Sequence, residues 1–417
     1  MYDLAIIGAG AGGIACAKSA LKAGLKILLV DRSFDLFGGT CINRGCIPTK
    51  FFLNNIKHGK QWEDIFSSKA QLIDKIRLPL LKHLTTQGVD MMWGQASFVD
   101  KHKLIIADQY IEAKNFIIAA GSSPRMLASG PKIVSAEDIF SLPKIPSKIL
   151  IVGGGYIGIE MASLLHVCGC DITVVEKEER ILPGFDQRIV NRFRIILETK
   201  GIKIDTGRSY TDYNLNDYGL ILMAVGRIPD IQHLQLNNCG VDLDARGWVV
   251  TDKRMRTTSD NIYACGDVTG KKMLAYTAEY QAHLCINNIT RSMTTPFAEE
   301  DYNGLAQCVF SFPQLAHTGI SEDEAKAANI KYTVLRTNFL KFSSAYVYDD
   351  TDGYMQIILD ENRLIIGADI ISNHAGELIS VLAEAVANKV PADALARCLF
   401  VHPTLSEIIP LALRMDS

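Results

Sequence analysis

Two stretches of the chain repeat one pattern of strand, glycine turn and helix, and this repeat constrains the fold more than any other feature. The first is residues 4–13, LAIIGAGAGG, and the second is residues 149–158, ILIVGGGYIG. Each stretch continues into a helical period and then into a second apolar strand that ends in an acid, Asp31 or Glu176. Strand–helix–strand crossovers of this kind build parallel sheets. The sequence therefore predicts an α/β protein with two Rossmann-like dinucleotide-binding domains.

The glycine turns indicate nucleotide binding because glycine allows the backbone N–H groups at a helix N-terminus to approach a pyrophosphate. The candidate residues of the two turns are Gly8, Gly10 and Gly13 in the first and Gly153, Gly155, Tyr156, Ile157 and Gly158 in the second. Tyr156 either covers the nicotinamide pocket or packs against its neighbours. The alternative for both turns is a purely structural role. Two complete patterns predict two bound dinucleotides.

The acids at the strand ends indicate which nucleotides bind. Asp31 and Glu176 are placed to accept hydrogen bonds from ribose hydroxyls. A carboxylate at position 176 favours the free 2′-hydroxyl of NAD over the 2′-phosphate of NADP. Lys177 and Arg180 lie nearby and weaken this preference without removing it. We expect NAD(H) in the second domain.

A pair of cysteines follows the first domain's opening unit. Cys41 and Cys46 are separated by four residues, within Gly38-Gly39-Thr40-Cys41-Ile42-Asn43-Arg44-Gly45-Cys46. If Gly39-Thr40 opens a helix, the thiols lie about a turn and a half apart, and local distortion brings them to bonding distance. A helix N-terminus also lowers a thiol pKa. Two buried cysteines or half of a zinc site are the alternatives, but no second cysteine pair or Cys/His cluster has matching spacing, so we expect no metal.

Bulk properties exclude several classes of function. The chain has 417 residues and a net charge of −3, which gives no electrostatic reason to expect nucleic acid or an anionic membrane as a partner. The apolar run at residues 149–175 is interrupted by glycines and by Glu160, so it is read as a buried strand–turn–helix and not as a membrane span. A strand begins at the N-terminus, without room for a targeting peptide. We expect a cytoplasmic protein.

The cysteine motif resembles the redox motif of the flavin-dependent pyridine nucleotide-disulfide oxidoreductases of class I. The resemblance covers almost the whole chain and rests on residues 38–50, 120–124, 153–160, 224–229, 263–268 and 402–407. It implies FAD and NAD as cofactors, a C-terminal α+β dimerisation domain and a homodimer with shared active sites. The implied domains are residues 1–145 (first part of the FAD domain), 146–227 (NAD domain), 228–295 (central FAD part) and 296–417 (dimerisation domain).

The resemblance also implies a role for individual residues. Cys41 would exchange with the substrate sulfur, and Cys46 would lie against the flavin. Lys50 would sit beside the flavin ring and pair with Glu160. Further FAD contacts would come from Gly39, Thr40, Ala96, Gly121, Asp267 and Ala275, and further NAD contacts from Ala224, Gly226 and Arg227.

His402 and Glu407 form the remaining candidate pair. A histidine accepts a thiol proton near neutral pH, and a carboxylate on the far side of the ring holds its orientation. Taken alone, His402 reads as a structural histidine. The His-Pro-Thr-x-Ser-Glu match with the family favours a catalytic base contributed to the partner subunit's site.

Within the family the motifs are most similar to those of dihydrolipoamide dehydrogenases. This implies electron transfer from dihydrolipoamide through Cys41 and Cys46 to FAD and NAD+, with a lipoyl-bearing protein of a 2-oxo-acid dehydrogenase or glycine-cleavage complex as partner. The chain is shorter than usual after Lys50 and between Gly201 and Ala224, which leaves the disulfide substrate open. A related NAD(P)H-dependent disulfide or metal reductase in stress defence is the first alternative. A non-enzymatic redox sensor or assembly subunit is the second.

Overall fold

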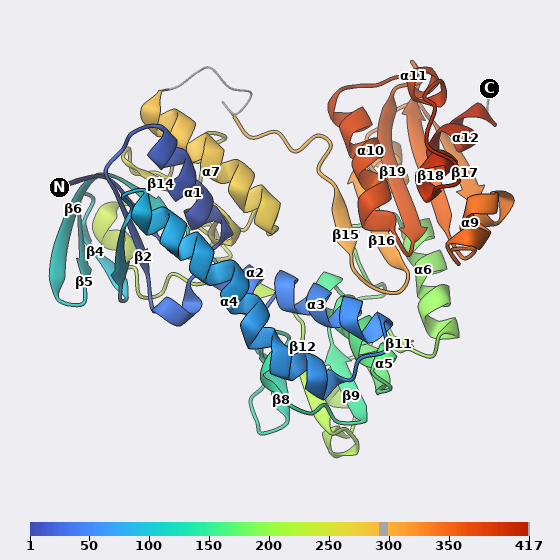
Figure 1. Ribbon diagram of the computed structural model, residues 1–417, viewed down its shortest axis with the longest axis horizontal. Helices are drawn as coiled ribbons and strands as arrows, with labels where there is room; N and C mark the ends of the chain where they lie inside the picture. The colour runs from blue at the N-terminus through green and yellow to red at the C-terminus, as the bar shows by residue number, and fades with distance from the viewer. Residues whose placement is uncertain (292–298, 416–417) are drawn as a thin grey trace. The chain divides into compact units, whose positions relative to one another are not determined.

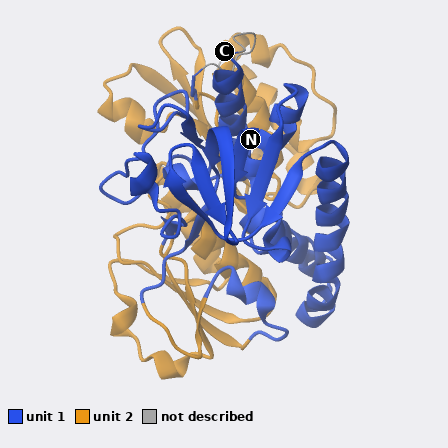
Figure 2. Ribbon diagram, turned by 90° about the vertical axis from the view of Figure 1, so that its left-hand side faces the viewer, with its two compact units in different colours: residues 1–127, 135–145, 226–301 blue, residues 128–134, 146–225, 302–417 orange. Residues whose placement is uncertain are grey.

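The computed structural model describes residues 1–291 and 299–415 and divides the chain into two compact units. Unit 1 comprises residues 1–127, 135–145 and 226–301, and unit 2 comprises residues 128–134, 146–225 and 302–417 (Figure 2). Both units are therefore discontinuous in sequence. The expected domain boundary at residues 295 and 296 lies outside the described residues.

Unit 1 is built on a seven-stranded mixed sheet with the order β3-β2-β1-β6-β5-β4, in which β14 also pairs with β6 (Figure 1). β1 pairs in parallel with β2 and β6, and β14 pairs in parallel with β6, whereas β4, β5 and β6 are antiparallel. A separate two-stranded ribbon joins β7 and β13. The strands are β1 (Tyr2–Ile7), β2 (Ile27–Asp31), β3 (Asp90–Trp93), β4 (Ala96–Asp100), β5 (Lys103–Ile106), β6 (Gln109–Ile118), β7 (Ser122–Pro124), β13 (Arg227–Pro229) and β14 (Ile262–Ala264).

Both faces of this sheet are buried, as expected of strands that read as continuous apolar runs. Leu4 and Ile6 of β1 face one core, and Ala5 and Ile7 face the other. The helices of unit 1 are α1 (Ala11–Lys22), α2 (Gly39–Asn43), α3 (Cys46–Lys57), α4 (Trp62–Thr86) and α7 (Ala275–Thr290). α1 and α7 pack side by side in the core that contains Leu4.

Unit 2 contains two sheets. The first has the order β11-β10-β9-β12-β8, with β9 parallel to β10 and β12, and its residues include the second glycine turn. Its elements are β8 (Ile133–Ser135), β9 (Lys148–Val152), α5 (Tyr156–Val167), β10 (Asp171–Val175), α6 (Gln187–Thr199), β11 (Lys203–Asp205) and β12 (Leu220–Met223).

The second sheet of unit 2 is antiparallel, with the order β15-β16-β19-β18-β17, and α10 packs on β16 and β19. Its elements are β15 (Gln307–Val309), β16 (Gln314–Gly319), α8 (Glu322–Ala327), β17 (Tyr332–Asn338), α9 (Ser343–Val347), β18 (Tyr354–Asp360), β19 (Ile365–Ser372), α10 (Ala375–Ala387), α11 (Ala392–Ala396) and α12 (Ile408–Arg414). This is the expected α+β arrangement after two Rossmann-like sheets. Among the described residues, no helix has both the length and the apolar character needed to cross a membrane.

Candidate active site and family

The first glycine turn joins β1 to α1 and is closed by a carboxylate. Gly8 has a φ of +104°, and a Cβ at Gly13 would lie 1.8 Å from the Gly8 carbonyl oxygen, so α1 starts directly against the turn. Asp31 at the end of β2 accepts hydrogen bonds from the backbone N–H groups of Ala9 (2.8 Å) and Arg32 (2.7 Å). Burial raises the pKa of the Asp31 carboxyl group.

The second turn repeats this construction in unit 2. Gly153 has a φ of +110°, and a Cβ at Gly158 would lie 1.9 Å from the Gly153 carbonyl oxygen. Glu176 accepts hydrogen bonds from the backbone N–H groups of Gly154 (2.7 Å) and Glu178 (2.9 Å). The sequence predicts that Asp31 and Glu176 bind ribose. The structure shows that each carboxylate accepts a backbone hydrogen bond from its glycine turn, which the sequence did not indicate.

Both turns fit a pyrophosphate group. Gly10 and Gly155 are the N-caps of α1 and α5, and neither helix has a side-chain cap or an acidic residue in its first turn. A Cβ at Gly155 would meet no protein atom within 4 Å, and one at Gly10 would reach only Gly39 at 3.8 Å. The helix N-termini therefore present backbone donors beside open space, as dinucleotide binding requires.

The two candidate thiols lie on either side of a helix break. Cys41 lies in α2, the chain leaves helical geometry at Arg44 and Gly45, and Cys46 is the first residue of α3. Asn43 fixes the break because its side-chain amide donates to the carbonyl oxygens of three residues, namely Leu36 (3.2 Å), Phe37 (3.0 Å) and Gly39 (2.9 Å). The segment expected to form one helix therefore forms two. The break between them takes the place of the local distortion that a single helix would have needed to bring the two sulfurs together.

The pKa of Cys41 also differs from the sequence-based expectation. A hydrogen bond with the Cys46 thiol and partial burial raise the pKa of Cys41 instead of lowering it, while the positive charge of Lys50 acts in the opposite direction. Lys50 lies four residues after Cys46 in α3, one turn along the same face. The structure therefore gives the Cys41 thiol a raised pKa, the opposite of the direction expected from a helix N-terminus.

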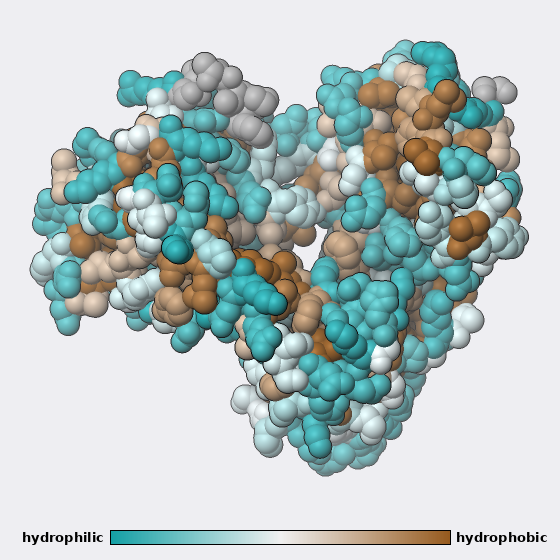
Figure 3. All heavy atoms as spheres, viewed as in Figure 1, coloured by the Kyte–Doolittle hydropathy of each residue, from teal (hydrophilic) through white to brown (hydrophobic). Residues whose placement is uncertain are grey.

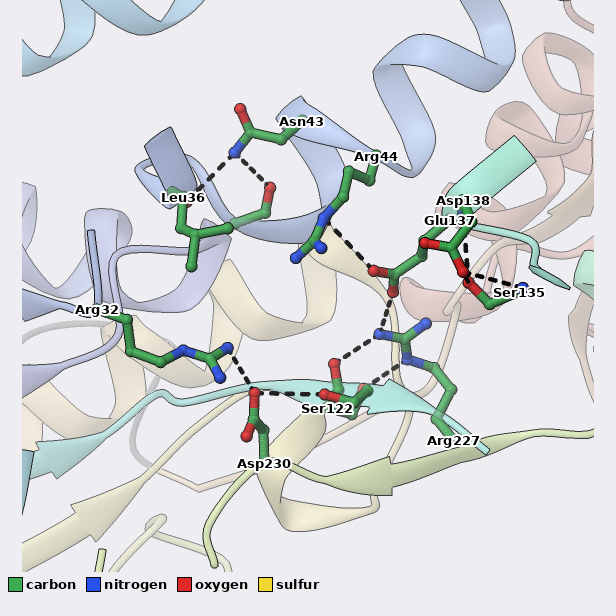
Figure 4. A network of polar contacts seen from close by, with 12 residues as sticks. Arg32, Leu36, Asn43, Arg44, Ser122, Ser135, Glu137, Asp138, Arg227 and Asp230 are labelled. Atoms are coloured by element: carbon green, nitrogen blue, oxygen red, sulfur yellow. Dashed lines mark hydrogen bonds and ion pairs between the residues drawn. The ribbon is translucent and has the colours of Figure 1, made fainter. Parts of the chain in front are cut away.

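A polar network in unit 1 ends at the predicted flavin residue Asp267. Asp267 accepts a hydrogen bond from the Ser122 hydroxyl group (2.6 Å), and Ser122 follows Gly121, which has a φ of +76°. Arg227 donates from Nε to the Ser122 hydroxyl oxygen (2.6 Å) and from its terminal nitrogen to Glu137 (2.8 Å). Figure 4 shows Arg227 pointing toward Glu137 and Ser122.

Other predicted residues of unit 1 are distributed around the sheet and helices. Thr40 lies in α2, Ala96 opens β4, and Ala275 opens α7. Arg227, expected at the nicotinamide nucleotide, belongs to unit 1, where its guanidinium group binds Glu137 and Ser122. Sequence reasoning missed Glu137, because an acid next to Asp138 in a short connecting segment carries no signal in a single sequence.

The remaining predicted NAD residues divide between the two units. The carbonyl oxygen of Ala224 would meet a Cβ at Gly153 at 2.4 Å, so Ala224 lies directly behind the turn. Gly226, with a φ of +98°, begins the last segment of unit 1. Tyr156 opens α5 and donates a hydrogen bond to the Gln307 side chain (2.9 Å), and Ile157 next to it is partly exposed.

Glu160 and the C-terminal pair lie in unit 2. Glu160 accepts a hydrogen bond from the backbone N–H of Phe310 (2.9 Å), and its pairing with Lys50 stays a prediction because Lys50 belongs to unit 1. His402 Nδ1 lies 2.8 Å from Glu407 Oε2. The side chain of Glu407 is only 10% exposed, whereas that of His402 is 70% exposed. Because a carboxylate only accepts, Nδ1 donates and Nε2 is left as the proton acceptor.

Two family models cover most of the chain. The model of the pyridine nucleotide-disulphide oxidoreductases matches residues 2–282, and the model of their dimerisation domain matches residues 305–413. The chain belongs to the pyridine nucleotide-disulphide oxidoreductase family. This oxidoreductase therefore uses FAD and a nicotinamide dinucleotide, and its dimerisation domain makes it a homodimer.

Curated relatives and solved structures match this oxidoreductase over nearly its full length. Dihydrolipoyl dehydrogenase of Chlamydia trachomatis is 32% identical over 98% of this chain and 95% of its own, and the Bacillus subtilis enzyme is 31% identical over 97% and 94%. Among solved structures, the HOCl-induced flavoprotein disulfide reductase RclA from Escherichia coli has a TM-score of 0.93 with 26% identity, and covers 100% of both chains.

Proposed function

We propose that this oxidoreductase is a dihydrolipoamide dehydrogenase, which oxidises protein-bound dihydrolipoamide and reduces NAD+. The carrying observation is the pair of thiols at a helix break, with Cys41 in α2, Cys46 at the start of α3 and Lys50 one turn further along α3. The assignment of dihydrolipoamide rests on the relatives from Chlamydia and Bacillus, which match over more than nine-tenths of their length. The location remains the cytoplasm, as the sequence predicts.

The thiols supply the exchange chemistry. The first substrate thiolate attacks Cys41 of the Cys41–Cys46 disulfide, so that a substrate–Cys41 bond forms and Cys46 leaves as the thiolate. The second substrate thiolate attacks the substrate sulfur of that mixed disulfide, which releases the oxidised lipoyl ring and the Cys41 thiolate. Two electrons thereby pass from the substrate to the cysteine pair, and two thiol protons are released.

His402 is proposed as the base that accepts the substrate protons. Its Nε2 is free to accept because Nδ1 donates to Glu407, and the ring is well exposed. Its neighbours Leu399 and Val401 are 91% and 75% exposed, and apolar side chains gather at the surface of the C-terminal part of the chain in Figure 3. An exposed base beside exposed apolar residues is expected where a second subunit covers this surface.

The nucleotides complete the electron path. The first glycine turn and the segment around Asp267 would hold FAD, which would supply the two-electron carrier between the dithiol and the nicotinamide nucleotide. Glu176 in unit 2 favours NAD over NADP because its carboxylate repels a 2′-phosphate. Lys50 contributes positive charge next to the dithiol, which stabilises a thiolate there.

A reductase of stress defence is the second candidate, because RclA matches the complete chain with a TM-score of 0.93. Two assays on the purified flavoprotein separate the candidates: NADH formation from NAD+ and dihydrolipoamide, and NAD(P)H oxidation by Cu(II) or by disulfides other than lipoamide. We expect the first activity to dominate and to disappear in Cys41→Ser. Dominance of the second would overturn the dihydrolipoamide assignment, and absence of both would favour a redox sensor.

A further inference from the structure

Arg44, which lies between the two cysteines, points toward a carboxylate from a distant part of the chain. Its Nε atom is buried and lies 3.6 Å from Glu137 Oε2. Glu137 precedes a short 3-10 helix (Asp138–Ser141), and its side chain is only 9% exposed. Figure 4 shows this contact, in which the Nε atom of Arg44 faces the Glu137 carboxylate. The segment between the sulfurs therefore has a second attachment besides the amide of Asn43.

The other oxygen of the same carboxylate binds a second arginine. Glu137 Oε1 accepts a hydrogen bond from Arg227 (2.8 Å), which also donates to the hydroxyl oxygen and the carbonyl oxygen of Ser122, both at 2.6 Å. Ser122 in turn donates to Asp267 at 2.6 Å. A continuous chain of charged and polar contacts thus runs from Arg44 to the predicted flavin residue Asp267.

The Glu137 carboxylate is buried and therefore depends on its charged partners, of which Arg227 is largely buried (12% exposed) and Arg44 is partly exposed (43%). We propose that Glu137 is a positioning residue for the Cys41–Cys46 dithiol. Through Arg44 it fixes the segment between the sulfurs, and through Arg227 it ties that segment to Ser122 and Asp267. This inference rests on the redox role proposed for the dithiol and is independent of the disulfide substrate.

The charge of Glu137 gives the inference a measurable signature. Glu137→Gln removes one negative charge, so Arg44 loses its ion pair with Glu137 while Arg227 keeps Asp267 (3.7 Å), and the added net positive charge favours the thiolate form of the dithiol. Lys50 and Glu279 also act on the Cys41 thiol, and they are unchanged in this variant. Arg44→Gln removes a positive charge from the same pair, so it has the opposite effect. A general loosening of the fold would instead change the reactivity of the dithiol in the same direction in both variants.

The experiment measures the rate of iodoacetamide modification of Cys41 and Cys46 against pH in the reduced holoenzyme, together with the midpoint potential of the dithiol. We expect Glu137→Gln to speed modification about 3- to 10-fold below neutral pH and to raise the potential. Arg44→Gln should slow modification, and Glu137→Asp should restore most of the wild-type profile. Asp138→Asn is the matched control, because the Asp138 carboxylate binds the backbone N–H and hydroxyl group of Ser135.

Each outcome decides a separate question. Wild-type profiles in both Glu137→Gln and Arg44→Gln, or a shift of the same sign in both, would overturn the positioning role. If Glu137→Gln does not fold, Arg44→Gln and Glu137→Asp carry the comparison, since both retain the pairing between Arg227 and an acid. A wild-type dithiol that cannot be oxidised and reduced reversibly would instead refute the proposed function.

Discussion

The substitution Gly158→Ala tests the packing of the second glycine turn, because the added Cβ has no room. Its Cβ would lie 1.9 Å from the carbonyl oxygen of Gly153, whereas Cβ atoms in proteins essentially never come closer than 3.0 Å to a neighbour. Because the opposing atom belongs to the backbone, α5 and the turn have to separate by about 1.1 Å, the difference between these distances. Gly158→Ala therefore forces a movement that no rotamer change relieves.

Overpacking of this kind lowers the free energy of unfolding by about 1–3 kcal/mol. For a unit of this size, each kcal/mol lowers Tm by about 2–4 °C, so we expect a decrease of about 2–12 °C. Gly155→Ala is the matched control, because a Cβ there meets no protein atom within 4 Å. It should leave Tm unchanged and weaken NAD+ binding, since the methyl group enters the space kept for the pyrophosphate.

Differential scanning calorimetry gives the unfolding temperature, and isothermal titration with NAD+ and NADH gives the affinities. The two variants should differ in what they lose: Gly158→Ala should lose stability, and Gly155→Ala should lose affinity for the nucleotide. Gly158→Ala with the Tm and affinity of the wild type would refute the packing calculation. Gly155→Ala with unaltered affinity would show that the turn does not hold the nucleotide.

Three further predictions concern unit 2 and the buried thiols. Glu407→Gln should lower kcat about 10²-fold with the fold intact, because His402 loses the carboxylate that orients it. Steady-state kinetics give kcat and circular dichroism checks the fold. An unchanged kcat would contradict the prediction. Burial lowers the pKa of His317, but the negative charge of Asp369 and the hydrogen bond that His317 Nδ1 donates to it (2.9 Å) outweigh burial and raise the pKa. The His317–Asp369 pair therefore stabilises the fold fully below about pH 6.5, the ordinary histidine pKa, and this stabilisation is lost as the pH rises through the raised pKa of His317. Urea unfolding across this range should show the loss in the wild type but not in His317→Asn. Cys285 is fully buried and its pKa is raised, so iodoacetamide should modify it only on unfolding, and mass spectrometry of the native protein should find it unmodified.

The parts of the fold that repeat a local pattern could be predicted from the sequence. Strand β1, its glycine turn and α1 follow from a continuous apolar run, the glycines and a helical period, and the same holds for β9 and α5. The residue types at each turn also indicate a nucleotide, because few other uses require glycines at those positions. The family confirms the resemblance on which FAD and NAD were expected.

The parts that depend on distant contacts could not be predicted. The break between α2 and α3 depends on the Asn43 amide reaching three carbonyl groups, and no local propensity encodes those partners. The raised pKa of Cys41 comes from the orientation of its thiol toward Cys46, which spacing alone does not specify. Glu137 meets Arg44 and Arg227 across separations of about ninety residues, so a single sequence gives no sign of the pairing.

The discontinuity of unit 1 has a consequence for how the chain is synthesised. β14 completes the sheet by pairing with Phe116 to Ile118 of β6, although 146 residues separate Ala264 from Ile118. At about 5–20 residues per second, a ribosome takes roughly 7–30 s to cover that distance. Throughout this interval β6 offers an unsatisfied apolar edge, and α1 lacks the cover of α7. We therefore expect the nascent protein to be most prone to association through this edge while the ribosome is building the first sheet of unit 2.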